Sequence, residues 1–174
     1  MSPALLQFTA PTRLRLPDLL NITDRFADDA LSGRFDHLLP AGGLPTEGRW
    51  FTRLHADDDL DVWLISWISG HTTELHDHAG SLGALTVLSG SLHELRWDGS
   101  GLRRRRLDAG DQAAFPLGWV HDVTAADDDW PETLSVHAYS PPLTAMSYYE
   151  VTGRNRLRRT RTELTDEPES AVSA

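Results

Sequence analysis

Short apolar runs separated by turn residues dominate the chain between about residue 50 and residue 150. The runs are DVWLISWIS (61–69), SLGALTVLSGSLHELRW (81–97), QAAFPLGWVHDV (112–123) and LSVHAYS (134–140). They are rich in β-branched and aromatic residues, which favour strands. Gly, Pro and Asp clusters interrupt them about every ten residues, a spacing typical of a β-sandwich or small barrel. We therefore predict a mainly β fold.

The two ends of the chain have a different texture. From Pro17 to about Leu39, apolar residues recur at steps of three and four, which predicts one or two short helices. The tail is polar, acidic and without aromatic residues, so we expect it to be disordered. The predicted division is an N-terminal helical segment packed on the barrel (1–42), the barrel (43–155) and the polar tail (156–174).

Composition excludes several classes of function. The 174 residues suit one domain, and 16 basic against 26 acidic side chains give a net charge of -10, which disfavours nucleic acid and anionic membranes as partners. Without cysteine, neither a disulfide nor a Cys-ligated metal is possible. No signal-peptide pattern or long apolar run is present. We expect a cytoplasmic protein, monomeric and without a membrane segment.

A pair of histidines lies in the stretch GHTTELHDHAGSLGALTVLSG, residues 70–90. On a strand, His76 and His78 project from the same face, because successive side chains alternate. Two imidazoles on one face can hold one metal ion. The same pair could equally be hydrogen-bonded surface histidines.

The surroundings of the pair resemble the two signature motifs of the cupin superfamily, G-x5-H-x-H-x4-E-x6-G and G-x5-P-x-G-x2-H-x3-N. The matching positions are Gly70, His76, His78, Gly90, Gly110, Pro116, Gly118 and His121. Gly83 replaces the usual Glu, and Ala125 the usual Asn. The resemblance implies a jelly-roll barrel, the double-stranded β-helix of the cupins, with His76, His78 and His121 converging inside it.

Three neutral imidazoles suit a late first-row divalent ion and leave coordination positions open for substrate and oxygen. With Gly83 in place of the carboxylate ligand, the ion keeps its full positive charge. Such a site favours an anionic ligand such as a thiolate.

A second group of polar residues alternates in the stretch SVHAYSPP, residues 135–142. On a strand, Ser135, His137 and Tyr139 face the same way and could form a hydrogen-bonded row beside the metal. The row could be catalytic or a satisfied polar ladder within the barrel.

Several blocks between residues 50 and 150 resemble the thiol dioxygenases and, among them, the cysteine dioxygenases. They are FTR (51–53), Trp67, HDH (76–78), WVHDV (119–123) and SVHAYSPP (135–142). The resemblance implies an Fe(II) enzyme that adds both atoms of O2 to the sulfur of L-cysteine, giving cysteine sulfinic acid.

The same resemblance implies roles for individual residues. The iron ligands are His76, His78 and His121, and the outer row is Ser135, His137 and Tyr139. Arg53 binds the substrate carboxylate, with Trp67 and Tyr139 also in the substrate site, and the Ser140–Pro141 peptide is cis.

Departures from the family pattern leave alternatives open. Gly83 stands where animal enzymes carry the cysteine that crosslinks to the catalytic tyrosine, and Phe51 replaces a tyrosine. A related group acts on 3-mercaptopropionate or another small thiol and carries Gln in place of the arginine, but the glutamines here are Gln7 and Gln112. Two further alternatives are a non-catalytic metal-binding cupin and a zinc-dependent isomerase, the latter disfavoured by the missing carboxylate.

Overall fold

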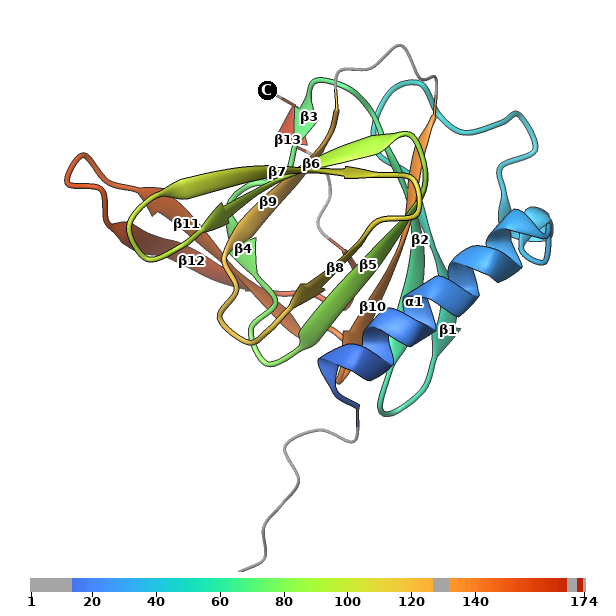
Figure 1. The fold of residues 1–174 in the computed structure, drawn as a ribbon, viewed down its shortest axis with the longest axis horizontal. Coiled ribbons are helices and arrows are strands. Elements are labelled where there is room, and N and C mark those ends of the chain that lie inside the picture. Colours follow the sequence, from blue (N-terminus) through green and yellow to red (C-terminus); the bar gives the residue numbers. More distant parts are fainter. Residues whose placement is uncertain (1–13, 127–131, 169–171, 174) are drawn as a thin grey trace, which may run out of the picture.

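The computed structural model describes residues 14–126, 132–168 and 172–173 (Figure 1). Two antiparallel sheets face each other and enclose a barrel-shaped core. The first sheet has the order β1 (Phe51–Ala56), β2 (Asp61–Trp67), β10 (Thr133–Ser140), β5 (Leu82–Ser89) and β8 (Gln112–Phe115). The predicted mainly β fold is confirmed.

The second sheet supplies the opposite wall. Its order is β12 (Leu157–Leu164), β11 (Ala145–Val151), β4 (His76–Asp77), β9 (His121–Ala125), β3 (His71–Thr72) and β13 (Val172–Ser173). β6 (Ser91–Trp97) pairs with β9 on one side and with β7 (Leu102–Asp108) on the other. Because β4 and β9 are neighbours, the histidines of the two sequence motifs lie on adjacent strands.

β2 shows how the alternation builds two cores. Trp63, Ile65 and Trp67 point into the barrel, whereas Val62 and Leu64 point to the other face of the sheet, beneath the helix. Every residue of β2 is therefore buried. A strand covered on both faces reads as a continuous apolar run, as this one does in the sequence.

One α-helix, α1 (Leu16–Leu31), covers the outer face of the first sheet (Figure 1). Leu19, Thr23 and Ala27 are its buried positions, and a 3-10 turn, η1 (Asp36–Leu38), follows it. The predicted helical segment is confirmed as one α-helix and this turn. No helix in the described part of the chain is long and apolar enough to cross a membrane.

The expected disorder of the tail is wrong for the residues described there. β12 pairs with β11 along its whole length, so the sheet extends to Leu164, beyond the predicted boundary at residue 155. Most residues of β12 are exposed, because the strand lies at the edge of the sheet. Such a strand needs no apolar alternation, and its polar composition imitates that of a disordered segment. The remaining tail residues, 169–171 and 174, lie outside the described ranges.

Candidate metal centre and pocket

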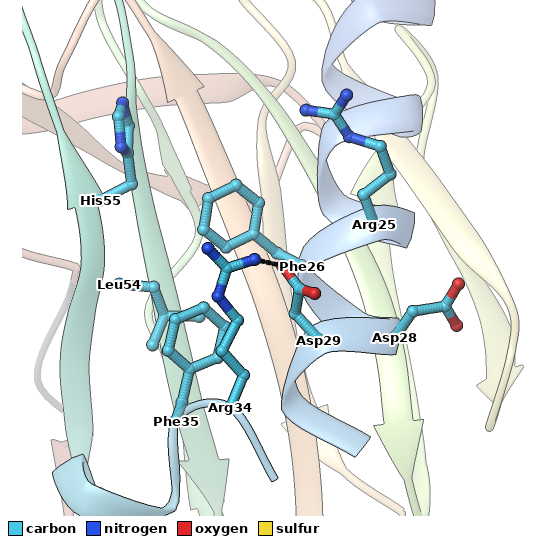
Figure 2. Close-up of a pocket in the computed structure, with 8 residues that line it drawn as sticks. All are labelled: Arg25, Phe26, Asp28, Asp29, Arg34, Phe35, Leu54 and His55. Carbon is cyan, nitrogen blue, oxygen red and sulfur yellow. Dashed lines mark hydrogen bonds and ion pairs between the residues drawn. The ribbon is translucent and has the colours of Figure 1, made fainter. Parts of the chain in front are cut away.

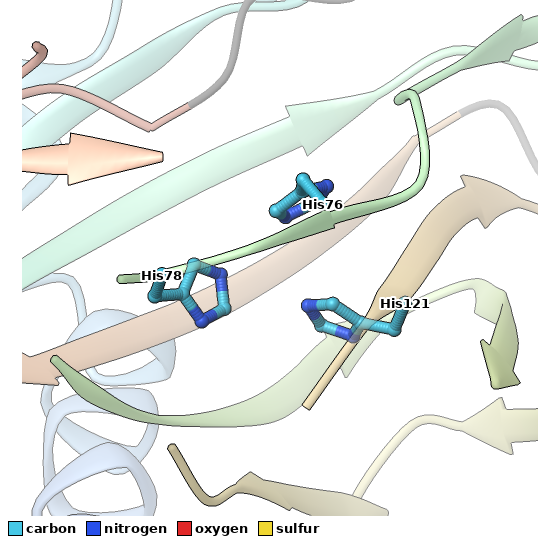
Figure 3. A group of neighbouring side chains, drawn as sticks. All are labelled: His76, His78 and His121. Atoms are coloured by element: carbon cyan, nitrogen blue, oxygen red, sulfur yellow. The ribbon is translucent and has the colours of Figure 1, made fainter. Parts of the chain in front are cut away.

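Three histidines converge inside the barrel (Figure 3). His76 on β4 stands directly across from His121 on β9, and His78 follows β4. The ring centroids are 4.9 Å apart for His76 and His121, and 5.2 Å apart for each of the other two pairs. One nitrogen from each ring lies within 4.8 Å of the other two, and all three side chains are buried.

Hydrogen bonds orient two of the rings. Nδ1 of His76 is 2.7 Å from the backbone oxygen of Glu74, and Nδ1 of His121 is 3.0 Å from Oε1 of Glu94. Nε2 of His121 is buried and has no hydrogen-bond partner among the described residues. A buried polar nitrogen without a partner is costly, and a metal ion would satisfy it.

The electrostatics of the cluster also fit a metal ion. Burial lowers the pKa of His121 to about 4, although the Glu94 carboxylate opposes the shift. Burial and the neighbouring histidines place the pKa of His78 well below its usual range. These two imidazoles are therefore neutral near pH 7, the form that binds a metal. The residues present thus fit a divalent ion held by three imidazole nitrogens.

Glu94 on β6 was missed by the sequence analysis. Its side chain is fully buried, and Oε1 accepts hydrogen bonds from Nδ1 of His121 and from Nε1 of Trp119, the latter at 2.9 Å. Oε2 accepts a hydrogen bond from Nε of Arg105. Burial alone would raise the pKa of Glu94, but these donors and the charge of Arg105 lower it to about 2. A carboxylate two residues from Leu92, on the apolar face of a strand, was the available signal.

The polar row on β10 lies beside the histidines. Nε2 of His137 is 2.9 Å from Oγ of Ser135, and Nδ1 of His137 is 3.3 Å from the hydroxyl of Tyr139. The indole of Trp67, on the neighbouring strand β2, donates a hydrogen bond of 2.8 Å to Ser135. These contacts form a continuous hydrogen-bonded row from Trp67 to Tyr139. All four side chains are buried. The peptide after the row, Ser140–Pro141, is cis as predicted.

The three histidines and two members of the polar row, His137 and Tyr139, line one small pocket, which we call the histidine pocket. Its walls are Arg49, Trp67, Thr73, His76, His78, His121, Val123, His137, Tyr139 and Met146. Met146 comes from β11, so the strand near the C-terminus contributes to the site. As far as the described residues go, the lining contains one guanidinium, one phenol and three candidate metal ligands, but no carboxylate.

Arg53, predicted to bind the substrate carboxylate, is not among the residues that line this pocket. Arg53 lies on β1 across from Trp63, with its guanidinium carbon 4.4 Å from the Trp63 ring centroid. Its Nη2 donates a hydrogen bond of 2.8 Å to the backbone oxygen of Asp166. β1 is an edge strand, and the chain after β12 returns beside it, so Arg53 binds this returning segment.

Arg49 supplies the guanidinium of the pocket instead. It lies in the segment just before β1, and its guanidinium carbon is 4.1 Å from the ring centroid of Trp67. Nε and Nη1 of Arg49 are buried. The cation therefore stacks on the tryptophan that supports the polar row.

Gly83 on β5 lies between Tyr139 and Phe115 in the sheet. A Cβ atom at this position would be 3.0 Å from Cδ2 of Phe115, 3.3 Å from Nδ1 of His78 and 3.4 Å from Cδ1 of Tyr139. Glycine thus allows His78 and Tyr139 to approach each other, with ring centroids 4.9 Å apart.

A separate cleft lies outside the barrel, between α1 and β1 (Figure 2). Phe26 and Phe35 stack in it with ring centroids 5.9 Å apart, and Arg34 pairs with Asp29 at 2.7 Å. No predicted metal ligand and no member of the polar row lines this cleft. The predicted chemistry is therefore confined to the barrel.

The fold and the site define a metal-binding cupin. A family model, cysteine dioxygenase type I, matches residues 44–152, and the chain belongs to that family. The predicted family is confirmed, and with it a thiol dioxygenase type of enzyme. No curated protein sequence matches the chain.

Several solved structures are similar to the chain at low sequence identity. An uncharacterized conserved protein with a double-stranded β-helix domain from Klebsiella pneumoniae is 18% identical, with a TM-score of 0.50 over 72% of this chain and 93% of that one. KdgF from Halomonas sp. is 21% identical, with a TM-score of 0.47 over 55% and 82%. The Cnp3 cupin domain of Schizosaccharomyces pombe is 8% identical, with a TM-score of 0.47 over 59% and 67%.

Proposed function

We propose that the chain is an Fe(II)-dependent dioxygenase that oxidises the thiol of L-cysteine to cysteine sulfinic acid. The reaction balances as RS⁻ + O2 → RSO2⁻, with both oxygen atoms added to sulfur. The observation that carries the proposal is one pocket in which three imidazoles, the guanidinium of Arg49 and the phenol of Tyr139 all meet. A small thiol with a carboxylate matches this set of groups.

The three histidines would hold the metal. An iron ion bound there would supply redox chemistry and favour the thiolate form of the substrate. Among the described residues, none contributes a carboxylate to the pocket lining, so the substrate thiolate would be the anionic partner of the metal. Glu94 and the backbone of Glu74 would keep the rings of His121 and His76 in the binding orientation.

Arg49 would bind the substrate carboxylate. A guanidinium presents parallel N–H donors that match the two carboxylate oxygens. Stacking on Trp67 limits the orientations that the side chain can adopt. Burial of Nε and Nη1 strengthens their interaction with an anion, because water is excluded from the contact. The carboxylate would thus be fixed relative to the histidines.

Tyr139 would place a hydroxyl proton toward the reacting groups. If Trp67 donates to Ser135, the Ser135 hydroxyl can donate to Nε2 of His137, whose Nδ1 proton then points to the Tyr139 oxygen. In this arrangement the phenol keeps its own proton for a partner in the pocket. Such a proton can stabilise charge that develops on the substrate or on oxygen.

Pocket composition favours L-cysteine over the alternative reactions. Gln112 donates to the backbone of Leu20 and to Thr86, on the helix-covered side of the sheet, and Gln7 lies outside the described residues. Among the described residues that line the pocket, none is the glutamine expected for a 3-mercaptopropionate enzyme. A non-catalytic cupin would have no need of Arg49 together with the polar row.

The test is anaerobic reconstitution with Fe(II), followed by addition of L-cysteine and O2. We expect one O2 consumed for each cysteine sulfinate formed, measured with an oxygen electrode and by chromatography. A parallel assay with 3-mercaptopropionate tests the substrate. Faster turnover of that thiol would contradict the assignment of cysteine, and no sulfinate from any small thiol would contradict the dioxygenase.

A further inference from the structure

Another cavity, of about 290 Å³, lies where the edges of the two sheets meet, and arginine dominates its walls. The lining is Arg96, Arg103, Arg104, Arg105, Ala114 and Trp119, which we call the arginine pocket. It lies outside the histidine pocket and shares none of its lining residues. Nothing in the proposed reaction uses it.

The strand register brings three of these arginines to one side. Arg96 on β6 stands across from Arg103 on β7, and Glu94 stands across from Arg105. Side chains of directly paired residues share a face, as do those two residues apart on one strand. Arg96, Arg103 and Arg105 therefore project together, and Trp119 lies beside them.

The arginine pocket contains more guanidinium groups than carboxylates that pair with them. Nε of Arg103 is 2.6 Å from Asp98, and Arg105 pairs with Glu94. Arg104 instead hydrogen-bonds the ring of His93, which must be the acceptor because a guanidinium only donates. Two cations, Arg96 and Arg104, thus remain without a carboxylate partner among the described residues, on a chain whose net charge is -10.

Of these two cations, Arg96 is the better placed to bind an anion. It is half-buried, and its guanidinium carbon lies 5.0 Å from the ring centroid of Trp119. Stacking on an indole holds the planar group while its N–H donors stay available at the edge. The arrangement resembles the stacked Arg49 and Trp67 of the histidine pocket, but it is open to solvent.

We propose that the arginine pocket binds a small oxyanion between Arg96 and Arg103, against Trp119. Planar guanidinium groups recognise carboxylate, sulfinate, sulfate and phosphate through paired N–H donors. The small volume suits one such group rather than a polymer. Glu94 contacts both Arg105, in the wall of this pocket, and His121, a candidate metal ligand. The bound oxyanion would therefore be connected to the metal site through the Glu94 carboxylate.

The test uses the indole resonances of the full chain, labelled with nitrogen-15 and loaded with Zn(II) as a diamagnetic occupant of the histidines. Among the six tryptophans, Trp119 reports on the arginine pocket and Trp67 on the histidine pocket. Single Trp→Phe variants assign the two resonances. Sodium sulfate is then titrated at constant ionic strength, with chloride as the balancing anion.

We expect the Trp119 resonance to shift and saturate in the wild type, and the apparent dissociation constant to rise about tenfold or more in Arg96→Gln. Arg158→Gln is the matched control, because Arg158 is an exposed arginine on β12 that pairs with Glu150. This control should bind like the wild type. Unchanged positions of the other indole resonances would show that Arg96→Gln remains folded.

A parallel titration with cysteine sulfinate identifies the source of the oxyanion. Saturation at a lower concentration than with sulfate assigns the pocket to a sulfinate, and the reverse assigns it to an inorganic anion. A Trp119 shift that stays linear, or that is the same in Arg96→Gln, overturns the proposal. A shift confined to Trp67 also overturns it, because the anion then binds in the histidine pocket, and the proposed oxidation is unaffected.

Discussion

The histidine pocket and the arginine pocket lie close together on one sheet but differ in depth. Arg96 on β6 stands directly across from His121 on β9, so the two pockets are one residue pair apart. His121 is fully buried, whereas Arg96 is half-buried and Arg103 is exposed. From β9 across β6 to β7, the sheet therefore passes from a closed interior to an exposed rim.

Depth decides which ionisable groups each pocket can hold. Burial penalises charge, so the interior contains imidazoles held neutral, and the rim contains guanidinium groups that stay charged in contact with water. Two charged groups depart from this rule: Arg49, whose Nε and Nη1 are buried in the histidine pocket, and the buried carboxylate of Glu94. Three donors, from His121, Trp119 and Arg105, offset the cost of its burial. The Glu94 carboxylate thus connects the two pockets, because it contacts His121 in one and Trp119 and Arg105 in the other.

The largest expected effect comes from removing one buried histidine of the candidate metal centre. His121→Ala leaves two imidazoles, and we expect retained iron after dialysis to fall from about one ion per chain to nearly none, with loss of activity. Metal analysis by mass spectrometry measures it. His55→Ala is the control, because His55 is partly exposed outside the barrel and pairs with Asp57. Full iron retention in His121→Ala would show that the cluster is not the metal site.

The next effect separates the half-buried Arg49, just before β1, from the exposed Arg53 on that strand. Arg49→Gln should lower kcat/KM for L-cysteine about 100-fold, through loss of a charged hydrogen-bonded contact worth roughly 2–3 kcal/mol. Arg53→Gln should stay within about threefold of the wild type, because Arg53 contacts the segment after β12. Steady-state oxygen consumption gives both values. The reverse order would return the carboxylate site to Arg53.

These two arginines show where sequence reasoning succeeds and where it stops. His76 and His78 could be placed together because a strand alternates with a fixed period, and His121 because its motif matches the cupin spacing. Arg49 precedes a strand, and its direction depends on how that segment closes over Trp67. No local period predicts such a tertiary contact.

The same limit explains the strand in the tail. β12 is stabilised by backbone pairing with β11 and by Arg161, whose Nη2 is 2.7 Å from Glu74. Backbone pairing leaves no signature in side-chain polarity. Composition alone could therefore not distinguish this edge strand from a disordered tail.

Glu94→Gln tests the link between the two pockets. All three contacts of Glu94 are donors, so the amide group of glutamine must face at least one of them, with donor against donor. We expect iron affinity to fall about tenfold, as when the partner of a ligating histidine is altered. Competition with a chelator measures it. Glu74→Gln is the control, because it keeps the backbone oxygen that holds His76, and an equal loss there would contradict a specific role for Glu94.

Gly83→Ala tests how closely the interior is packed. The added methyl group would lie 3.0 Å from Phe115 and 3.3 Å from His78, so one of these rings must move. We expect a destabilisation of about 1–2 kcal/mol and a fall of several-fold in kcat/KM. Chemical denaturation and oxygen uptake measure the two effects. At Gly80, where a Cβ atom would meet no heavy atom within 4 Å, the same substitution should change neither, and an equal loss there would deny a packing role to Gly83.

The smallest expected effect comes from Arg105, the partly exposed partner of Glu94. Arg105→Gln removes one donor to Glu94, but His121 and Trp119 still hold the carboxylate. Because the Arg105 side chain is 41% exposed, water and salt screen its charge, and we expect iron affinity to change by no more than about threefold. The same chelator competition, repeated at low and high salt, measures the change. If Arg105→Gln weakened iron binding as much as Glu94→Gln, the rim and the interior would act as one electrostatic unit, and an anion in the arginine pocket would then be felt at the metal.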